Sequence, residues 1–216
     1  MENSFVNIHS HQGSSIDEIT LVNTHEGFSD FQHPFHSIGL HPWFLQLRTI
    51  EREKNMLSAA LQNPAVKAIG ECGLDRVCAT PWALQLDAFR WQLSKAEEYN
   101  LPVIIHCVRA QQEVLTEMSR FKVAFVFHGF NRNLGMARQI LAAGGYLSFN
   151  LTSWRDGVGL KDLPLSRVFL ETDDQVGSIQ ESYKKCSIWM GCTIEDLKKR
   201  LYQNTIELGI KWNRNE

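Results

Sequence analysis

The sequence predicts an α/β fold, a TIM-type (β/α)8 barrel that is trimmed near its N-terminal end. Eight short runs rich in β-branched and aromatic residues recur along the 216 residues, and helical periodicity separates most of them after the third. Alternating strands and helices are typical of a parallel sheet with covering helices, and eight such units close into a barrel. An open, doubly wound sheet is the less favoured alternative.

The predicted strands are short, and several of them end in polar residues. They cover residues 5–9, 19–23, 35–40, 66–71, 103–106, 124–128, 145–149 and 168–172. The connections between the first three strands are too short for full covering helices, so we expect helices to be missing or reduced around these strands. The stretch between the last two strands is also poor in helical periodicity.

The predicted helices end at recognisable stop signals. They cover residues 49–62, 82–99, 111–119, 134–143, 179–190 and 193–208. Pro102 limits the second helix, because the residue before a proline is driven out of the α region. Gly144 can supply the positive φ at the end of the fourth. Thr193 and Asp196 resemble a capping box, with Asp in place of Glu, at the start of the last.

The composition predicts one globular domain over residues 1–216. Hydrophobic residues make up 44% of the chain, which is enough for a sizeable core. No apolar run approaches the roughly 20 residues that span a bilayer, and no signal peptide is visible at Met1. Five cysteines without a CxxC spacing indicate reduced thiols, so we expect a cytoplasmic protein that does not contact membranes. A net charge of −2 means that nucleic-acid binding would need a local basic patch.

Side chains that bind divalent metals occur at the ends of five predicted strands. They are His9, His11, Glu71, His106, His128 and Asp173. Taken singly, each has an ordinary alternative, such as a core histidine, a solvated carboxylate or a turn residue. Catalytic groups of these barrels gather at the carboxyl edge from several strands. The conjunction of six such residues therefore predicts a shared metal site.

Four histidines and two carboxylates exceed the ligands that one catalytic metal takes. This excess predicts two divalent ions that share a carboxylate, and Glu71 is the natural bridge. The donor set suits zinc, manganese or iron, and it also admits magnesium. Such a pair activates water and polarises a phosphoryl or carbonyl oxygen, so the predicted chemistry is hydrolysis.

Together these motifs resemble the TatD family of metal-dependent hydrolases, within the amidohydrolase-like superfamily of TIM-type barrels. The matching segments run from residue 5 to about residue 209 and read NIHSH, SIGLHPW, AIGECGLD, QLDAFRWQLSKAEEYNLPVIIHC, VFHGF, YLSFN, RVFLETD and IEDLKKRLYQNTIEL. The resemblance implies a divalent-metal-dependent deoxyribonuclease that cleaves phosphodiester bonds, with an exonuclease-like action on single-stranded DNA. It implies no obligate protein partner.

The resemblance also divides the ligands between two ions. The division is His9, His11 and Asp173 for one ion, His106 and His128 for the other, and Glu71 for both. Asp173 and Glu71 are the implied catalytic residues, and Asp173 would orient or deprotonate the attacking water. Glu171 and Asp75 match motif positions that would support the ligands.

Substrate-binding residues are expected on loops that follow the strands. His41 matches a family position near the substrate, and Trp43 is placed to stack on a base. Arg109 and Arg132 are candidates for phosphate contacts. Three weaker candidates of the same kinds are Arg76, Trp154 and Arg155. An ordinary surface loop residue is the alternative for each.

The chain departs from the family pattern around the expected substrate pocket, whereas the expected metal ligands match the pattern. Arg109 comes one position later after His106 than in many members, and Asp174 is followed by Gln175 where a proline is usual. An alternative function therefore keeps the metals but changes the bond to an ester or amide, as in an aminoacyl-tRNA deacylase. A non-catalytic metal-binding module is a further alternative.

Overall fold

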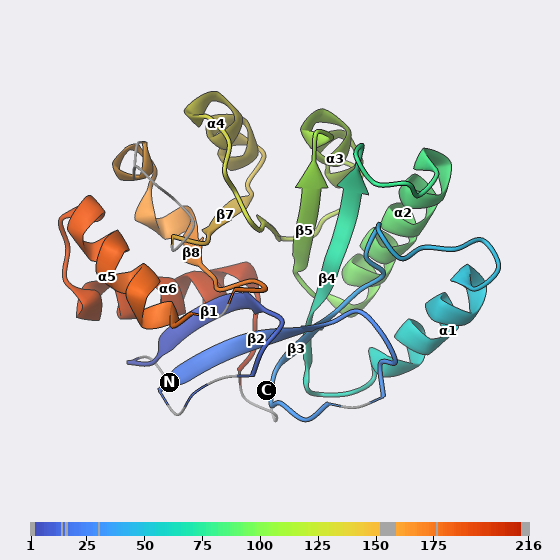
Figure 1. The fold of residues 1–216 in the computed structure, drawn as a ribbon, viewed down its shortest axis with the longest axis horizontal. Coiled ribbons are helices and arrows are strands. Elements are labelled where there is room, and N and C mark those ends of the chain that lie inside the picture. The colour runs from blue at the N-terminus through green and yellow to red at the C-terminus, as the bar shows by residue number, and fades with distance from the viewer. Residues whose placement is uncertain are drawn as a thin grey trace.

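The computed structural model describes residues 3–13, 15, 17–29, 31–151, 159–175 and 177–212. Eight parallel strands follow one another in the order β1 to β8 in a single sheet that curls into a nearly closed barrel (Figure 1). The strands are β1 Phe5–Ser10, β2 Glu18–Thr24, β3 His36–Ile38, β4 Val66–Asp75, β5 Val103–Val108, β6 Phe125–Phe127, β7 Tyr146–Phe149 and β8 Val168–Leu170. The predicted barrel is confirmed.

Six α-helices lie in the described part of the chain. They are α1 Ile50–Ala60, α2 Trp82–Tyr99, α3 Gln111–Met118, α4 Leu134–Ala142, α5 Ile179–Met190 and α6 Ile194–Leu208. The described residues between β1 and β2, and between β2 and β3, contain no helix, which confirms the predicted trimming. Between β7 and β8 the described residues form only two short 3-10 helices, Leu160–Asp162 and Leu165–Arg167.

Helix ends follow the predicted signals, with two differences in detail. Asn100 closes α2 in the left-handed conformation (φ 52°), two residues before the proline that was expected to limit it. Gly144 has φ 85° just after α4, as predicted. The Thr193 side chain accepts a hydrogen bond from the Asp196 N–H at 3.1 Å. The Asp196 carboxylate accepts from the Thr193 hydroxyl and not from its N–H, so only half of a capping box forms.

The barrel closes between β1 and the segment that follows β8. The Asp173 N–H donates to the His9 carbonyl at 3.1 Å, and the His11 N–H donates to the Asp173 carbonyl at 3.1 Å. Lower on the same seam, the Tyr183 hydroxyl of α5 accepts from the Val6 N–H at 2.9 Å. The carboxyl end of β1 is therefore fixed to the residue that was predicted to share its metal.

The core has two layers. A large cluster packs strand residues such as Val103 and Ile105 against the helices. A second cluster takes one residue from each of several strands, among them Ile104, Val126 and Phe169. Because side chains alternate between the faces of a strand, this second set fills the barrel interior below the carboxyl edge.

Two smaller predictions can be compared with the structure. The cysteines are all unpaired, as predicted. No helix in the described residues is both long and apolar enough to cross a membrane.

Candidate metal centre

The histidines reach the centre because they continue the inward faces of their strands. His106 and His128 lie two residues after Ile104 and Val126, which belong to the interior cluster. Side chains two residues apart on an extended strand share a face, so both imidazoles project into the top of the barrel. His9 lies within β1 and is fully buried, whereas His11 follows the end of β1 and is exposed.

The sequence suggested that Glu71 ends its strand, but the structure places Glu71 within the strand. β4 continues to Asp75, and its register with β5 shifts between Ile69 and Cys72. Such an irregularity re-aims a side chain in the middle of a strand. The Glu71 N–H donates to the Asn23 side chain at 2.7 Å, and the residue is only 4% exposed. Glu71 therefore reaches the centre from within β4 and not from its end.

The two carboxylate oxygens of Glu71 face two different groups of histidines. Oε2 lies 3.4 Å from His9 Nε2 and 3.6 Å from His11 Nε2. Oε1 lies 2.7 Å from both His106 Nδ1 and His128 Nε2. This partition coincides with the division of ligands that the family resemblance implies, with Glu71 between the two groups. The ligand roles themselves stay predictions.

Asp173 completes the first of these groups. Its Oδ1 lies 3.4 Å from His9 Nε2 and 3.6 Å from His11 Nε2. The backbone of Asp173 is left-handed (φ 57°), a conformation that aspartate adopts more readily than most residues. This turn directs the carboxylate back over the end of β1.

The donor set fits a divalent metal. Ligand atoms within 4.8 Å of one another occur in three groups: His9, His11 and Glu71; His9, His128 and Asp173; His41, Glu71 and His106. Neither ring nitrogen of His9 has a hydrogen bond of good geometry to any described residue, although both are buried. Buried polar atoms are rarely left without a partner, and a metal ion would supply one.

His41, which was predicted near the substrate, is buried beside the centre. Its Nε2 lies 3.1 Å from Glu71 Oε1. The Trp43 N–H donates to His41 Nδ1 at 3.2 Å, so in the neutral ring the proton is on Nε2. Burial lowers the pKa of His41, which favours this neutral form. His41 therefore donates to Glu71 in this structure, and it also lines the cavities described below.

Two carboxylates lie beside the outer nitrogens of the second group of histidines. Asp75 Oδ2 lies 3.2 Å from His106 Nε2 and accepts the Trp43 indole N–H at 2.6 Å. Glu171 is fully buried and lies 3.7 Å from His128 Nδ1. Partners of this kind orient a ligating imidazole and raise its basicity. Both residues lie where the predicted supports of the ligands would be needed.

The charges of the centre favour an ionised Glu71 beside protonated His9 and His128 when no metal is bound. Burial alone would raise the pKa of Glu71, but His128, His106 and His11 hold it well below its usual range. Burial would lower the pKa of His9, but the Asp173 and Glu71 carboxylates prevail and raise it to about 8. Burial would also lower the pKa of His128, but the Glu71 and Glu171 carboxylates beside it prevail and hold it well above its ordinary value.

Three cavities meet at the centre. One of about 260 Å³ lies over it, with His11, Glu71 and Asp173 in its wall. A second, of about 180 Å³, extends along the ends of β5 and β6 and is lined by Arg132. A third, of about 480 Å³, lies on the side of β2, β3 and α1, and Trp43 lines it together with the first.

The other substrate candidates are placed less favourably. Arg109 is exposed with a left-handed backbone (φ 52°) and lines none of these three cavities. Arg76 forms an ion pair with Glu113 and lies over the ring of Trp82 at 4.3 Å. Two further candidates, Trp154 and Arg155, lie outside the described residues.

His25 is a residue of this site that the sequence reasoning missed. It directly follows the end of β2, as His128 directly follows the end of β6, and it lines both the cavity over the centre and the largest of the three cavities. Its ring stacks on Phe44 with centroids 5.1 Å apart and lies 5.9 Å from the ring of His11. The signal was a histidine two residues after the end of a predicted strand, at the same edge as the others.

Comparison with known proteins gives a consistent result. The sequence model of a family described as TatD related DNase matches residues 11–208. The chain is 36% identical over 148 residues to the 3'-5' ssDNA/RNA exonuclease TatD of Enterobacter lignolyticus, a match that covers 62% of this chain and 55% of that protein. It is 30% identical over 149 residues to the human 3'-5' RNA nuclease TATDN2, covering 63% of this chain and 19% of the human protein. The matches thus span less than two thirds of the length of these relatives.

Solved structures show the same fold over almost the whole chain. The crystal structure of YJJV, a TatD homolog from Escherichia coli, superposes with a TM-score of 0.79 at 20% identity and covers 96% of this chain and 98% of that one. A TatD family hydrolase from Entamoeba histolytica superposes with a TM-score of 0.76 at 14% identity, covering 95% and 98%. These similarities concern the fold alone.

Proposed function

This chain belongs to the TatD-related DNase family, and from that premise we propose that it is a divalent-metal-dependent hydrolase that cleaves phosphodiester bonds in single-stranded nucleic acid. The observation that supports this most directly is the position of Glu71, whose two oxygens face separate groups of histidines. The names of the relatives from Enterobacter and human, a 3'-5' ssDNA/RNA exonuclease and a 3'-5' RNA nuclease, support exonuclease-like cleavage.

Two ions, drawn from magnesium, manganese and zinc, would be held by the two groups around Glu71. The proposed ligands are His9, His11 and Asp173 for one ion, His106 and His128 for the other, and Glu71 for both. Bound ions of this kind would acidify a water molecule and polarise the phosphoryl group whose phosphorus atom the water attacks. The mixture of imidazole and carboxylate donors supports this choice of metals.

The side chains of the centre supply the remaining steps. The pKa of Asp173 stays below its ordinary value: burial would raise it, but the close contact with the His9 ring and the charges of His128 and His9 lower it. Its carboxylate is therefore ionised at neutral pH and can accept a proton from the attacking water. His41 donates from Nε2 to Glu71 Oε1 at 3.1 Å, which keeps the Glu71 carboxylate oriented between the two groups.

The substrate would cross the face on which the three cavities open. Arg132 lines the cavity beside β5 and β6, where it is placed to contact a phosphate of the strand. The Trp43 ring is 56% exposed, and its bond to Asp75 fixes its orientation, so it offers a stacking surface. Arg109 would contact only a strand that extends beyond the cavities.

Metal-dependent cleavage of defined oligonucleotides tests this proposal. Protein dialysed against EDTA should release mononucleotides from single-stranded DNA only after magnesium, manganese or zinc is restored. Asp173→Asn, which keeps the left-handed backbone accessible, should be inactive under the same conditions.

Acyl esters separate the alternatives. If the protein cleaves p-nitrophenyl acetate or an aminoacyl ester while DNA and RNA stay intact with every metal, it is an ester or amide hydrolase. If it binds metal and hydrolyses none of these compounds, it is a non-catalytic metal-binding module.

A further inference from the structure

The largest of the three cavities lies beside the metal centre and has no part in the proposed hydrolysis. Its volume is about 480 Å³, within the range of pockets that hold small ligands. It shares His25, His41, Trp43 and Phe44 with the cavity over the centre, so the two spaces adjoin along these side chains. A substrate that is cleaved at the centre would therefore place a neighbouring group at this cavity.

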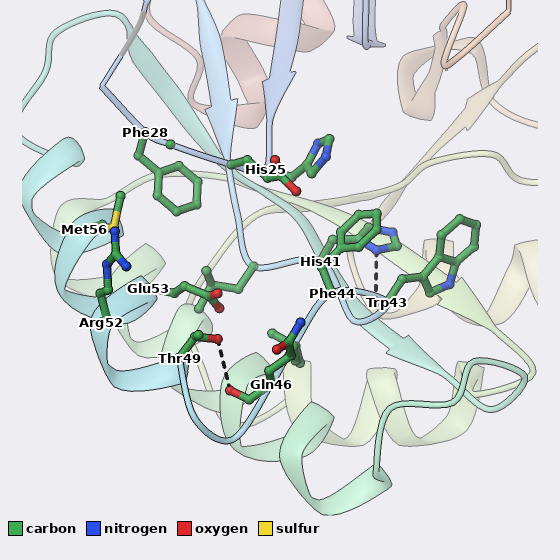
Figure 2. Close-up of a pocket in the computed structure, with 14 residues that line it drawn as sticks. His25, Phe28, His41, Trp43, Phe44, Gln46, Thr49, Arg52, Glu53 and Met56 are labelled. Atoms are coloured by element: carbon green, nitrogen blue, oxygen red, sulfur yellow. Dashed lines mark hydrogen bonds between the residues drawn. The ribbon is translucent and has the colours of Figure 1, made fainter.

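Aromatic side chains form two sides of the cavity. Figure 2 shows Phe28 on one side and His41, Phe44 and Trp43 on the other. Phe44 is 48% exposed although it is a large hydrophobic residue, and its ring stacks on His25. Phe28 has a left-handed backbone (φ 37°) directly after Gly27, a conformation that bulky residues seldom adopt. Flat apolar faces next to a phosphodiester site suit the π-face of a nucleobase.

The charges of the wall disfavour a phosphate as the occupant. The cavity is lined by two carboxylates, Glu26 and Glu53, and by one guanidinium, Arg52. The cavity beside β5 and β6 has the opposite character, because it contains Arg132 and only Asp173 as a carboxylate. Phosphates are repelled from the first and attracted to the second. The sugar–phosphate chain therefore leaves toward Arg132, and an uncharged group enters the largest cavity.

Glu53 is the residue that can distinguish one base from another. It extends from the first turn of α1 and is partly buried. Its carboxylate has no hydrogen bond or ion pair to any of the residues that the structure describes, and Figure 2 shows it on the same side of the cavity as Phe28. An ionised carboxylate only accepts hydrogen bonds, so it favours an exocyclic amino group over the N3–H of thymine or uracil, which lies between two carbonyl oxygens that repel the carboxylate.

We propose that this cavity is a nucleobase pocket, in which Phe44 stacks on the unpaired base next to the scissile phosphodiester and Glu53 accepts a hydrogen bond from the exocyclic amino group of that base. The proposal rests on the proposed nuclease function and adds a base preference to it. Cytosine, adenine and guanine are preferred over thymine and uracil at this one position. This base preference does not depend on the bases at other positions of the nucleic-acid strand.

Binding without catalysis is the first test. The probe is a short single-stranded oligonucleotide with 2-aminopurine near the cleaved end, titrated with EDTA-dialysed protein. Stacking on Phe44 quenches the fluorescence of this base, and Phe44→Ala removes the quenching and weakens binding by about tenfold, within the range typical of base–aromatic stacking. Leu47→Ala is the matched control, because Leu47 lies on the same loop, is 77% exposed and does not line the cavity. Unchanged quenching in Phe44→Ala overturns the proposal.

Base preference is the second test. Metal-loaded protein cleaves oligonucleotides that differ only in cytosine or thymine beside the scissile bond, and cytosine gives an about tenfold higher kcat/KM, as expected for one charge-assisted hydrogen bond. Glu53→Gln lowers this ratio toward one. The matched control is Glu51→Gln, which makes the same change on α1 at an exposed residue that pairs with Lys54 outside the cavity. A ratio near one in the wild-type protein, or a ratio that Glu53→Gln leaves unchanged, overturns the proposal.

A substrate without a base distinguishes failure of the nuclease function from failure of the base pocket. Bis(p-nitrophenyl) phosphate carries no nucleobase, so its hydrolysis by the wild-type protein reports whether the metal centre is active. If this compound and all oligonucleotides stay intact, the nuclease function fails, and the 2-aminopurine titration still decides whether the cavity binds a base. If both substrates are cleaved without dependence on Phe44 and Glu53, the nuclease function stands and the base pocket fails.

Discussion

Removal of the metals is predicted to reverse the pH dependence of stability, because His9 is buried beside two carboxylates. In the metal-free fold the pKa of His9 is raised to about 8, whereas an unfolded histidine has a pKa near 6.5. Below pH 6.5 both states bind the proton, and the stabilisation is fully present. As the pH rises through 8 the folded state loses its proton, and the stabilisation is lost.

The expected magnitude follows from this difference in pKa. His9 alone lowers the free energy of unfolding of the metal-free protein by on the order of 1 to 2 kcal/mol between pH 6.5 and pH 8.5. His128, whose pKa is also raised, contributes in the same direction. His41, whose pKa is lowered by burial, changes the free energy of unfolding mainly below pH 6.5. In the metal-loaded protein protons compete with the ions for the same nitrogens, so stability rises over this interval.

Urea unfolding followed by tryptophan fluorescence measures both slopes. The EDTA-dialysed protein and the metal-loaded protein are compared at pH 6.5, 7.5 and 8.5. His9→Asn serves as the control, because it removes the titrating ring and should flatten the metal-free slope in part, with the share of His128 remaining. A metal-free stability that is constant or increases over this interval would refute the electrostatic account of the centre.

Further substitutions test individual roles. His106→Ala and Asp173→Asn should each abolish phosphodiester hydrolysis while circular dichroism shows a retained fold, since both groups serve the centre more than the core. Glu171→Gln should weaken metal affinity or activity by roughly 10- to 100-fold, because the partner of a ligating imidazole is altered; isothermal titration with manganese measures this, and an unchanged affinity would argue against the role. Arg132→Ala should raise KM for single-stranded DNA and reduce the salt dependence of binding by a slope of about 0.7 per lost phosphate contact; an unchanged slope would place Arg132 outside the path of the strand.

The fold could be predicted from the sequence because the signals for helices and strands come from residues that are close together in the chain. The boundaries of α2 and α5 agree with the prediction, since their apolar spacing ends at Asn100 and at Gly191, which both adopt the left-handed conformation. The residues of the centre were identified because each apolar run gives way to a histidine or a carboxylate at the same edge of the predicted barrel. That pattern is visible in the sequence without any knowledge of distances.

Other features depend on contacts between distant segments. The extension of β4 to Asp75 follows from a register shift against β5, which no local pattern encodes. The contact of His41 with Glu71 depends on the loop after β3 folding over the barrel, where the Trp43 N–H fixes the His41 ring. The largest cavity likewise arises where the loop that contains Phe28 meets α1. These contacts join segments far apart in the sequence, so only the structure could show them.

The central claim is that Glu71 joins two metal ions, one on each side of its carboxylate. Manganese content per chain, measured together with the electron paramagnetic resonance spectrum of the loaded protein, tests this most directly. The account predicts two manganese ions per chain with the signal of an exchange-coupled pair, and Glu71→Gln should abolish the coupling and reduce the content. One uncoupled ion per chain, or a coupled pair that persists in Glu71→Gln, would contradict it.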